Sequence, residues 1–314
     1  MFACSLSIGR PGPAGKVTDQ ELIALAVAQA ATGLVSDRQF LSMIGGLLPG
    51  FFPDLPDQSQ FNRRLRRLTP PIATVQLGIA ELLAADCVRL VDGTLLSCAN
   101  FAGSAAYGYC AAKSRWYWGM RLLLVSDRRG TPLGYDLRPA NENEREGVWK
   151  LASAHSGSLL FADAGHRGRE HRESLGLLGV ELIVAERHGL GERPPAEILK
   201  ARIRLVVESV FSTLKRQMRL EDHLAKTLPG LAQRIVQRLL ALTIGMLINT
   251  ILSLAVHPER SPPTMDDEPT SSPYRTNGTP PRPRVSPDCL QSTVDNCKEY
   301  THCRSCQSAP LPAA

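Results

Sequence analysis

Two aspartates interrupt stretches of the sequence that are otherwise typical of buried β-strands. Asp92 lies within VRLVDGTLLS, and Asp163 lies within SLLFADAGHRG. Short aliphatic runs of this kind favour strands in the interior of a sheet. A carboxylate in such a run is costly to bury unless it is paired or binds a cation. The chain must therefore fold so that each strand brings its carboxylate to a partner or to a cation.

A third acidic residue lies in a predicted helix, with cations on the same face. The segment ARIRLVVESVFSTLKRQ places Arg204, Glu208, Phe211 and Lys215 at steps of four, three and four residues, which is one helix face. A carboxylate held among cations suits a metal and phosphate site. The alternative is that Arg204 and Lys215 are ordinary surface partners of Glu208, in pairs worth a few tenths of a kcal/mol.

Together these motifs resemble the DDE-type insertion-sequence transposases. The pattern Arg-x3-Glu-x6-Lys matches the last part of that family's signature, and Asp92 and Asp163 match its first and second aspartates in order. Asp163 follows Asp92 by 71 residues, and Glu208 follows Asp163 by 45. The family has Tyr three residues before the arginine, where this chain has Ala201. The resemblance covers roughly residues 36 to 255.

The resemblance implies an α/β fold, with a ribonuclease-H-like mixed sheet flanked by helices and preceded by an all-helical N-terminal region. It implies that Asp92, Asp163 and Glu208 are catalytic and bind Mg²⁺ or Mn²⁺, the ions that hard oxygen sites favour. The less specific alternative is that the aspartates are strand-end or turn residues and that Glu208 is a solvated helix residue.

The activity implied is transposition of DNA by two-metal catalysis. The enzyme would bind the terminal inverted repeats of its element, hydrolyse the phosphodiester at the ends and transfer the 3′ hydroxyls to target DNA. A homo-oligomer, most simply a dimer, would bring the two ends together, and the expected location is the cytoplasm at the bacterial nucleoid. Two rival functions stay open, namely a structure-specific nuclease of the same fold and an inactive DNA-binding derivative that acts as a regulator.

The order of predicted elements gives three regions. Residues 18–85 favour four helices, with Thr18, Ser36 and Ser59 as caps of the first three. The third, QFNRRLRRL, should end at Thr69-Pro70-Pro71. Residues 86–256 favour three strands, the last two forming a hairpin, and then alternating helices and strands, which is typical of a mixed sheet. Residues 257–314 contain eleven of the 23 prolines, so a disordered tail is predicted there.

Basic residues gather at places that suit a polyanionic partner, and the net charge of +6 permits one. Arg63, Arg64, Arg66 and Arg67 lie in one short helix without an acid among them, which favours a DNA contact over a merely solvated face.

In KSRWYWGMR, Lys113 and Arg115 are predicted to contact the DNA backbone. The neighbouring Trp116 and Trp118 either stack on unpaired bases or belong to the core, and the core is favoured. Arg204 and Lys215 are predicted to contact phosphates. His166 either approaches the scissile phosphate or is a surface residue of a turn.

Two further features have competing interpretations. The apolar run from Leu239 to Val256 is long enough for a membrane helix, but its polar interruptions favour a buried helix that closes the core, and no membrane partner is expected. The cysteines in the tail include Cys303-x2-Cys306, a spacing seen in zinc sites, although an incidental occurrence is favoured. Free thiols in a reducing cytosol are the default expectation.

Overall fold

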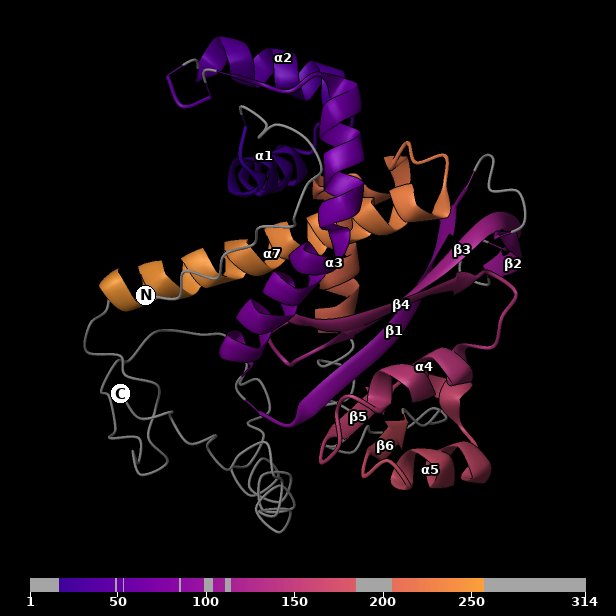
Figure 1. The fold of residues 1–314 in the computed structure, drawn as a ribbon. Helices are drawn as coiled ribbons and strands as arrows, with labels where there is room; N and C mark the ends of the chain where they lie inside the picture. Colours follow the sequence, from indigo (N-terminus) through magenta and orange to yellow (C-terminus); the bar gives the residue numbers. More distant parts are fainter. Residues whose placement is uncertain are drawn as a thin grey trace, which may run out of the picture.

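A single mixed β-sheet with helices on both faces forms the centre of the molecule, and a helical N-terminal region packs beside it (Figure 1). The computed structural model describes residues 17–48, 50–52, 54–84, 86–98, 104–110, 114–184 and 205–256. The predicted tail at residues 257–314 and the start of the helix that carries Glu208 lie outside these ranges. They therefore stay predictions.

The sheet has six strands, namely β1 (Val88–Ser97), β2 (Ala106–Cys110), β3 (Arg115–Ser126), β4 (Pro132–Pro139), β5 (Leu159–Ala162) and β6 (Glu181–Val184). The order is β2-β3-β1-β5-β6, and β4 also pairs with β3. β3 is antiparallel to β1 and β4, whereas β1, β5 and β6 are parallel neighbours. Three antiparallel strands followed by two parallel strands make the ribonuclease-H-like sheet that was predicted. Only β2 was not predicted.

Helices cover the two faces of this sheet with separate apolar cores. On one face lie α4 (Glu144–Ala152) and α5 (Arg169–Gly176), whose Val148 and Leu175 pack against Val91 and Leu123. On the other face lies the helix at residues 205–212, which continues as a π-helical turn, η3 (Thr213–Gln217). Its buried side chains pack against Leu90, Leu96, Leu122 and Leu124. Strand side chains alternate between these faces, so even-numbered residues of β1 point towards the helix that carries Glu208.

The N-terminal region consists of α1 (Asp19–Thr32), α2 (Asp37–Leu47) and α3 (Gln58–Leu83). Thr18 and Glu21 form a reciprocal capping box at the start of α1, and the Ser36 hydroxyl caps α2, so both predicted caps are confirmed. The cap of α3 is Asp57, whose carboxylate accepts from the Gln60 N–H at 2.8 Å. The prediction of Ser59 as this cap was wrong by two residues.

α3 is one continuous helix of 26 residues, so the prediction that Pro70 and Pro71 end it was wrong. A proline inside a helix removes a backbone donor and costs about 3 kcal/mol. Here Leu68 and Ile72, on either side of the prolines, are both buried in the same apolar core. Packing on both sides therefore keeps the segment helical despite the missing hydrogen bonds.

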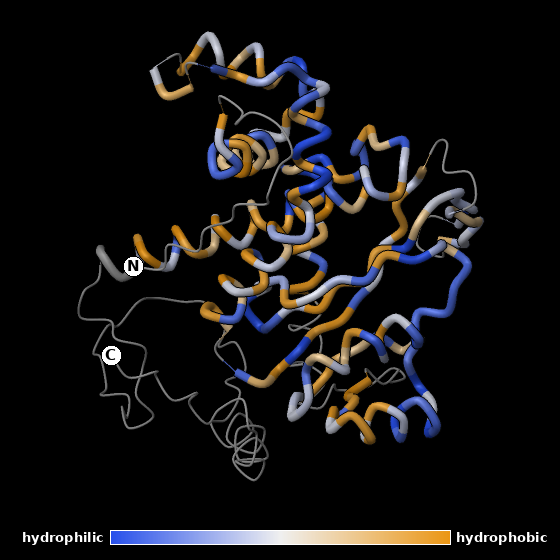
Figure 2. Tube along the Cα trace, viewed as in Figure 1, coloured by the Kyte–Doolittle hydropathy of each residue, from blue (hydrophilic) through white to orange (hydrophobic). Residues whose placement is uncertain are grey.

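The long helix α7 (Leu228–Val256) contacts both regions of the molecule. Leu231, Ile235 and Leu239 belong to the core beneath the sheet, whereas Val236 and Leu240 belong to the core of the N-terminal helices. A buried core helix was predicted for Leu239 to Val256, and this is confirmed only at the start of that run, where Leu239, Leu240, Ala241 and Thr243 are buried. By length and composition α7 would also suffice to cross a membrane, and its last turns are apolar and exposed (Figure 2), with Ile248, Ile251 and Leu252 about half-exposed.

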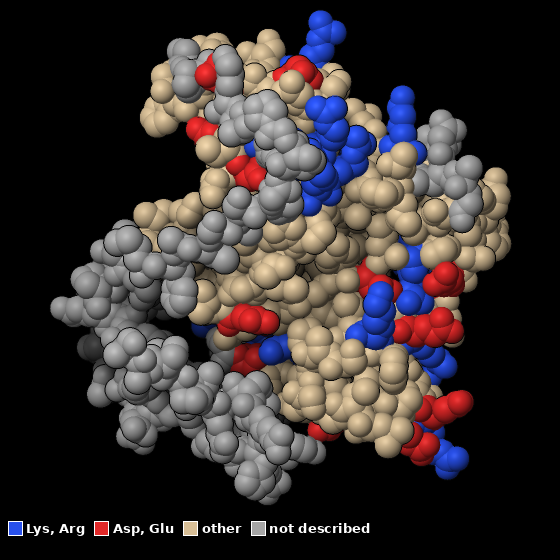
Figure 3. Space-filling view, viewed as in Figure 1, with Lys and Arg blue, Asp and Glu red and all other residues tan. Residues whose placement is uncertain are grey.

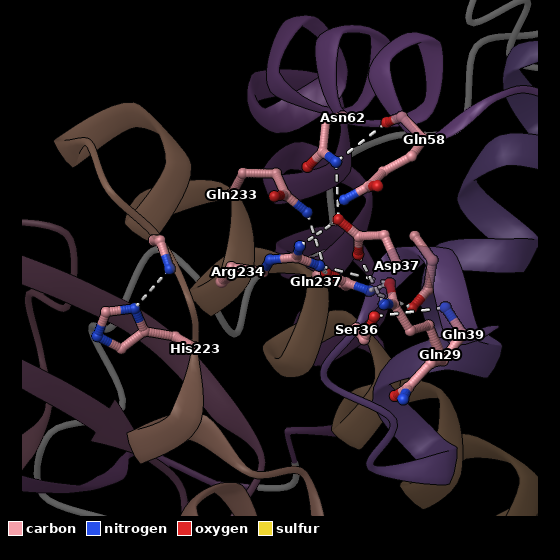
Figure 4. A network of polar contacts seen from close by, with 12 residues as sticks. Gln29, Ser36, Asp37, Gln39, Gln58, Asn62, His223, Gln233, Arg234 and Gln237 are labelled. Carbon is pink, nitrogen blue, oxygen red and sulfur yellow. Dashed lines mark hydrogen bonds and ion pairs between the residues drawn. The ribbon is translucent and has the colours of Figure 1, made fainter. Parts of the chain in front are cut away.

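A buried polar junction joins α7 to the N-terminal helices (Figure 4). Arg234 of α7 contacts the Asp37 carboxylate of α2 at 2.6 Å. Gln29 and Asn62 each donate an amide N–H to the same carboxylate, both at 2.7 Å. One turn further on, Arg238 donates to the Met218 carbonyl at 2.7 Å, just after η3. The junction therefore connects α2 through α7 to the end of the helix that carries Glu208.

Candidate active site

Asp92 lies in β1, and Asp163 comes directly after β5, the parallel neighbour of β1. The last paired residues of these two strands are Leu90 and Phe161, each two positions before its aspartate. Leu90 is in the core beneath the helix that carries Glu208, and Phe161 packs against that core. Because alternate residues of a strand share a face, Asp92 points towards this helix, whereas Asp163 lies beyond the end of β5 and belongs to the turn that follows it. Neither is buried, and the Asp163 side chain is 46% exposed.

A short turn fixes the position of Asp163. The residue caps the 3-10 helix η2 (Ala164–His166), and its carboxylate accepts from the Gly165 N–H at 2.9 Å. Arg145, at the start of α4, donates to the Gly165 carbonyl at 3.1 Å and to the Arg167 carbonyl at 2.6 Å. Sequence analysis missed Arg145, because it lies among ordinary alternating charges at a helix start. The guanidinium clamps the turn that presents Asp163.

His166 is buried beneath this turn, with only 3% of its surface exposed. Its Nε2 lies 3.7 Å from a Glu144 oxygen and 3.8 Å from Asp163 Oδ1. Burial lowers the pKa of His166, the charge of Asp163 acts against that shift, and the cation of Arg145 acts with it. The imidazole is therefore neutral at pH 7 and packs under the turn, so the alternative of a surface histidine was wrong.

Glu208 lies on the helix that packs over the sheet face of Leu90 and Phe161. Val207, Val210 and Phe211 anchor this helix in the core, whereas Glu208 is exposed. Lys215 lies in the π-helical turn and pairs with Glu221 at 3.2 Å. Arg204 is outside the described residues. Within the described ranges, no three His, Cys, Asp or Glu side chains converge closely enough to hold a metal ion.

The four arginines of α3 do not share one environment. Arg63, Arg66 and Arg67 are exposed, and Figure 3 shows basic side chains gathered over this end of α3. Arg64 instead is only 9% exposed and pairs with Asp19 of α1 at 2.6 Å. The prediction that Arg64 contacts DNA is therefore corrected, because its guanidinium holds α1 and α3 together.

The β2–β3 hairpin exposes its aromatic residues, so the prediction that Trp116 and Trp118 belong to the core was wrong. Trp116 is 66% exposed and Trp118 is 36% exposed. Their strand partners Tyr109 and Tyr107 lie opposite them. The Arg115 guanidinium lies 4.5 Å from the centre of the Tyr117 ring and also donates to its hydroxyl. Lys113 is outside the described residues.

A surface cavity of about 470 Å³ connects this hairpin with the turn that carries Asp163. Tyr107, Tyr109 and Trp116 line one part of it. Gly165 and His166 line another part, together with Arg121, Glu144 and Arg145. Arg121 and Glu144 form an ion pair in its wall. The cavity therefore runs from exposed aromatic rings to the turn that follows Asp163.

The mixed sheet has the ribonuclease-H-like order, with Asp92 on β1 and Asp163 directly after its parallel neighbour β5. The family model described as "Transposase DDE domain" matches residues 83–244, which extend from the end of α3 into α7. The chain therefore belongs to the DDE-domain transposase family.

Solved transposase structures show a weaker similarity. The Mos1 transposase paired-end complex with left transposon end has 13% identity and a TM-score of 0.23, covering 68% of this chain and 82% of that one. The Mos1 mariner paired end complex with Mn has 14% identity and a TM-score of 0.22, covering 77% and 81%. The family assignment rests on the family model and not on these superpositions.

Proposed function

We propose that this transposase cleaves DNA at the ends of its own element and joins the freed 3′ hydroxyls to target DNA. The observation that supports the proposal is that Asp92 and Asp163 each follow by two residues the paired Leu90 and Phe161 of two parallel strands, whose core is covered by the helix of Glu208. Two carboxylates brought close together would repel each other, which favours a site built for a cation over one built for stability.

The donor set fits a divalent cation of the hard class. Asp92, Asp163 and Glu208 offer carboxylate oxygens, the ligands that Mg²⁺ and Mn²⁺ prefer. Asp92 and Asp163 would hold the ion first, and Glu208 would complete the set. Bound there, Mg²⁺ would lower the pKa of an attacking water or hydroxyl and stabilise charge on the scissile phosphate.

The chain's own residues would prepare this site. The Gly165 N–H and the Arg145 clamp fix the turn at Asp163, and the neutral His166 fills the space beneath it. Because these contacts exist before DNA binds, little ordering would remain to be done during catalysis. The turn would thereby hold one carboxylate in place while the substrate phosphate docks.

Duplex DNA would contact the protein on its basic surfaces. Arg63, Arg66 and Arg67 on α3 have the exposure that phosphate contacts need. Arg115 on the hairpin and Lys215 near the Glu208 helix extend the proposed footprint, and Arg204 and Lys113 stay in it as predictions. A homodimer would bring the two ends of the element together, and it would act in the cytoplasm at the bacterial nucleoid.

The test compares isosteric variants with a matched carboxylate elsewhere. Asp92→Asn, Asp163→Asn and Glu208→Gln should each abolish Mg²⁺-dependent nicking of a duplex that carries the element's end, while duplex binding changes little. Glu170→Gln alters an exposed carboxylate on α5, across the sheet, and should nick normally. Near wild-type nicking by one of the three variants would remove that residue from the site.

The two rival functions are separated by the products of the same assay. A structure-specific nuclease would nick DNA without ever joining ends to a target plasmid. An inactive regulator would bind the ends, and even the unmodified chain would fail to nick them. The two aspartates favour the active enzyme, since a DNA-binding regulator gains nothing from bringing two acids together.

A further inference from the structure

Four aromatic side chains form an exposed ladder on the β2–β3 hairpin. Tyr107 packs edge-on against Trp118 with 5.0 Å between ring centres, and Tyr109 packs at a tilt against Trp116 with 5.4 Å. Between 36% and 66% of each residue is exposed. Large aromatic residues usually bury most of their surface, so an open ladder of four rings indicates a ligand with flat apolar faces.

The position of the ladder favours a ligand that also reaches the catalytic turn. The cavity lined by Tyr107, Tyr109 and Trp116 continues to Gly165 and His166, next to Asp163. Arg121 and Arg145 line the same cavity, where Glu144 pairs with Arg121, so Arg145 is the cation left for a ligand's negative charge. A molecule that fills it would place flat rings at the ladder and negative charge near Arg145.

We infer that this ladder stacks unpaired nucleobases of a DNA end whose scissile phosphate lies at Asp163. The inference rests on the proposed function, because it takes DNA as the substrate. A base exposes two flat faces only when it leaves its duplex, and stacking on an aromatic ring is independent of sequence. The phosphates attached to such bases would lie along the cavity towards Arg145.

A second copy of the chain is the competing occupant, and the chemistry disfavours it. The ladder adjoins a cavity with two arginines and two acids, Glu142 and Glu144. The apolar core of a protein interface is depleted of charged residues.

The experiment uses the full chain, Ca²⁺ in place of Mg²⁺, and two forms of one duplex. One form is blunt, and the other carries a short single-stranded thymine overhang with 2-aminopurine as its first unpaired base. The unmodified chain should bind the overhang form more tightly and change the fluorescence of that base. The double variant Trp116→Leu/Trp118→Leu should lose affinity for the overhang form by about 5- to 150-fold, the range measured for stacked bases.

Two further variants keep the result interpretable. Trp116→Phe retains a ring and should retain most of the overhang preference. Trp149→Leu removes the third tryptophan, which is 46% exposed on α4, and should bind both duplexes as the unmodified chain does. Circular dichroism of each variant reports whether the hairpin change has disturbed the fold.

The outcomes separate this inference from the proposed function. Equal binding of both duplexes by an unmodified chain that nicks DNA would overturn the stacking inference alone. An unmodified chain that binds neither duplex would count against the proposed function and the inference with it. A Trp116→Leu change that shifts the sedimentation of the protein without altering DNA binding would identify the ladder as a protein interface.

Discussion

The buried polar junction and the candidate active site use carboxylates in opposite ways. Asp37, at the junction, is 4% exposed and receives Arg234, Gln29 and Asn62. Asp163, at the candidate site, has a side chain that is 46% exposed and accepts from the Gly165 N–H. The first arrangement satisfies the charge within the fold, whereas the second leaves oxygen atoms open to a ligand. Surroundings, not residue type, distinguish a carboxylate that holds the fold from one that serves chemistry.

Breaking the junction should give the largest effect. Arg234→Met leaves Asp37 buried without its cation, and removing one partner of a buried pair costs about 3–5 kcal/mol. Urea unfolding should show this decrease in the free energy of unfolding. The double variant Asp37→Asn/Arg234→Met removes both charges and should recover part of the stability. A decrease below about 1 kcal/mol in the single variant would mean that the pair contributes little.

Acid should weaken the same junction. Burial by itself raises the pKa of Asp37, but the hydrogen bonds and charge of Arg234 outweigh it and hold that pKa below its ordinary value. The stabilisation is therefore complete above the pKa of the unfolded aspartate, about 3.9, and disappears as pH falls through the lower folded value. Melting curves from pH 6 to pH 2.5 should fall less steeply for Asp37→Asn. Parallel curves for both proteins would contradict this.

Features specified by nearby residues could be predicted from the sequence. Thr18 with Glu21 and Ser36 with its helix are local patterns, and both caps are confirmed. The apolar runs around Asp92 and Asp163 predicted two strands, and the fold pairs those strands in parallel. Each cap and each strand is specified by residues that are close together in the sequence, so it could be predicted without knowledge of tertiary contacts.

Features decided by distant partners could not be predicted. Arg64 resembles its neighbours in sequence, and only Asp19, 45 residues away, makes it a buried residue. α3 continues through Pro70 because the helical core holds both sides of it. Strand alternation puts Trp116 and Trp118 on one face, but it does not say whether that face is covered. Nor does the sequence show how closely Glu208 approaches the aspartates.

Neutralising one carboxylate at the candidate site should have a smaller and opposite effect on stability. Asp163→Asn keeps an oxygen for the Gly165 N–H but removes any repulsion with Asp92. Two like charges about 4 Å apart interact by about 1 kcal/mol in water, so the free energy of unfolding should rise by at most that amount. Urea unfolding at low salt with EDTA measures it, and Glu170→Gln is the control. A clear decrease in stability would mean that Asp163, like Asp37, stabilises the fold.

The exposed arginines of α3 should have the smallest effect on stability. Replacing Arg63, Arg66 and Arg67 with Gln keeps helix propensity and touches no described core contact, so stability should change by less than about 0.5 kcal/mol. Arg64→Gln alone should cost more stability, because it breaks the partly buried pair with Asp19.

DNA binding should show the reverse order, with the triple variant affected more than Arg64→Gln. Removing one phosphate contact lowers the slope of log affinity against log salt by about 0.9, so the triple variant should have the flatter slope. If Arg64→Gln flattened that slope while the triple variant did not, the assignment of Arg64 to packing and of its neighbours to DNA would have to be exchanged.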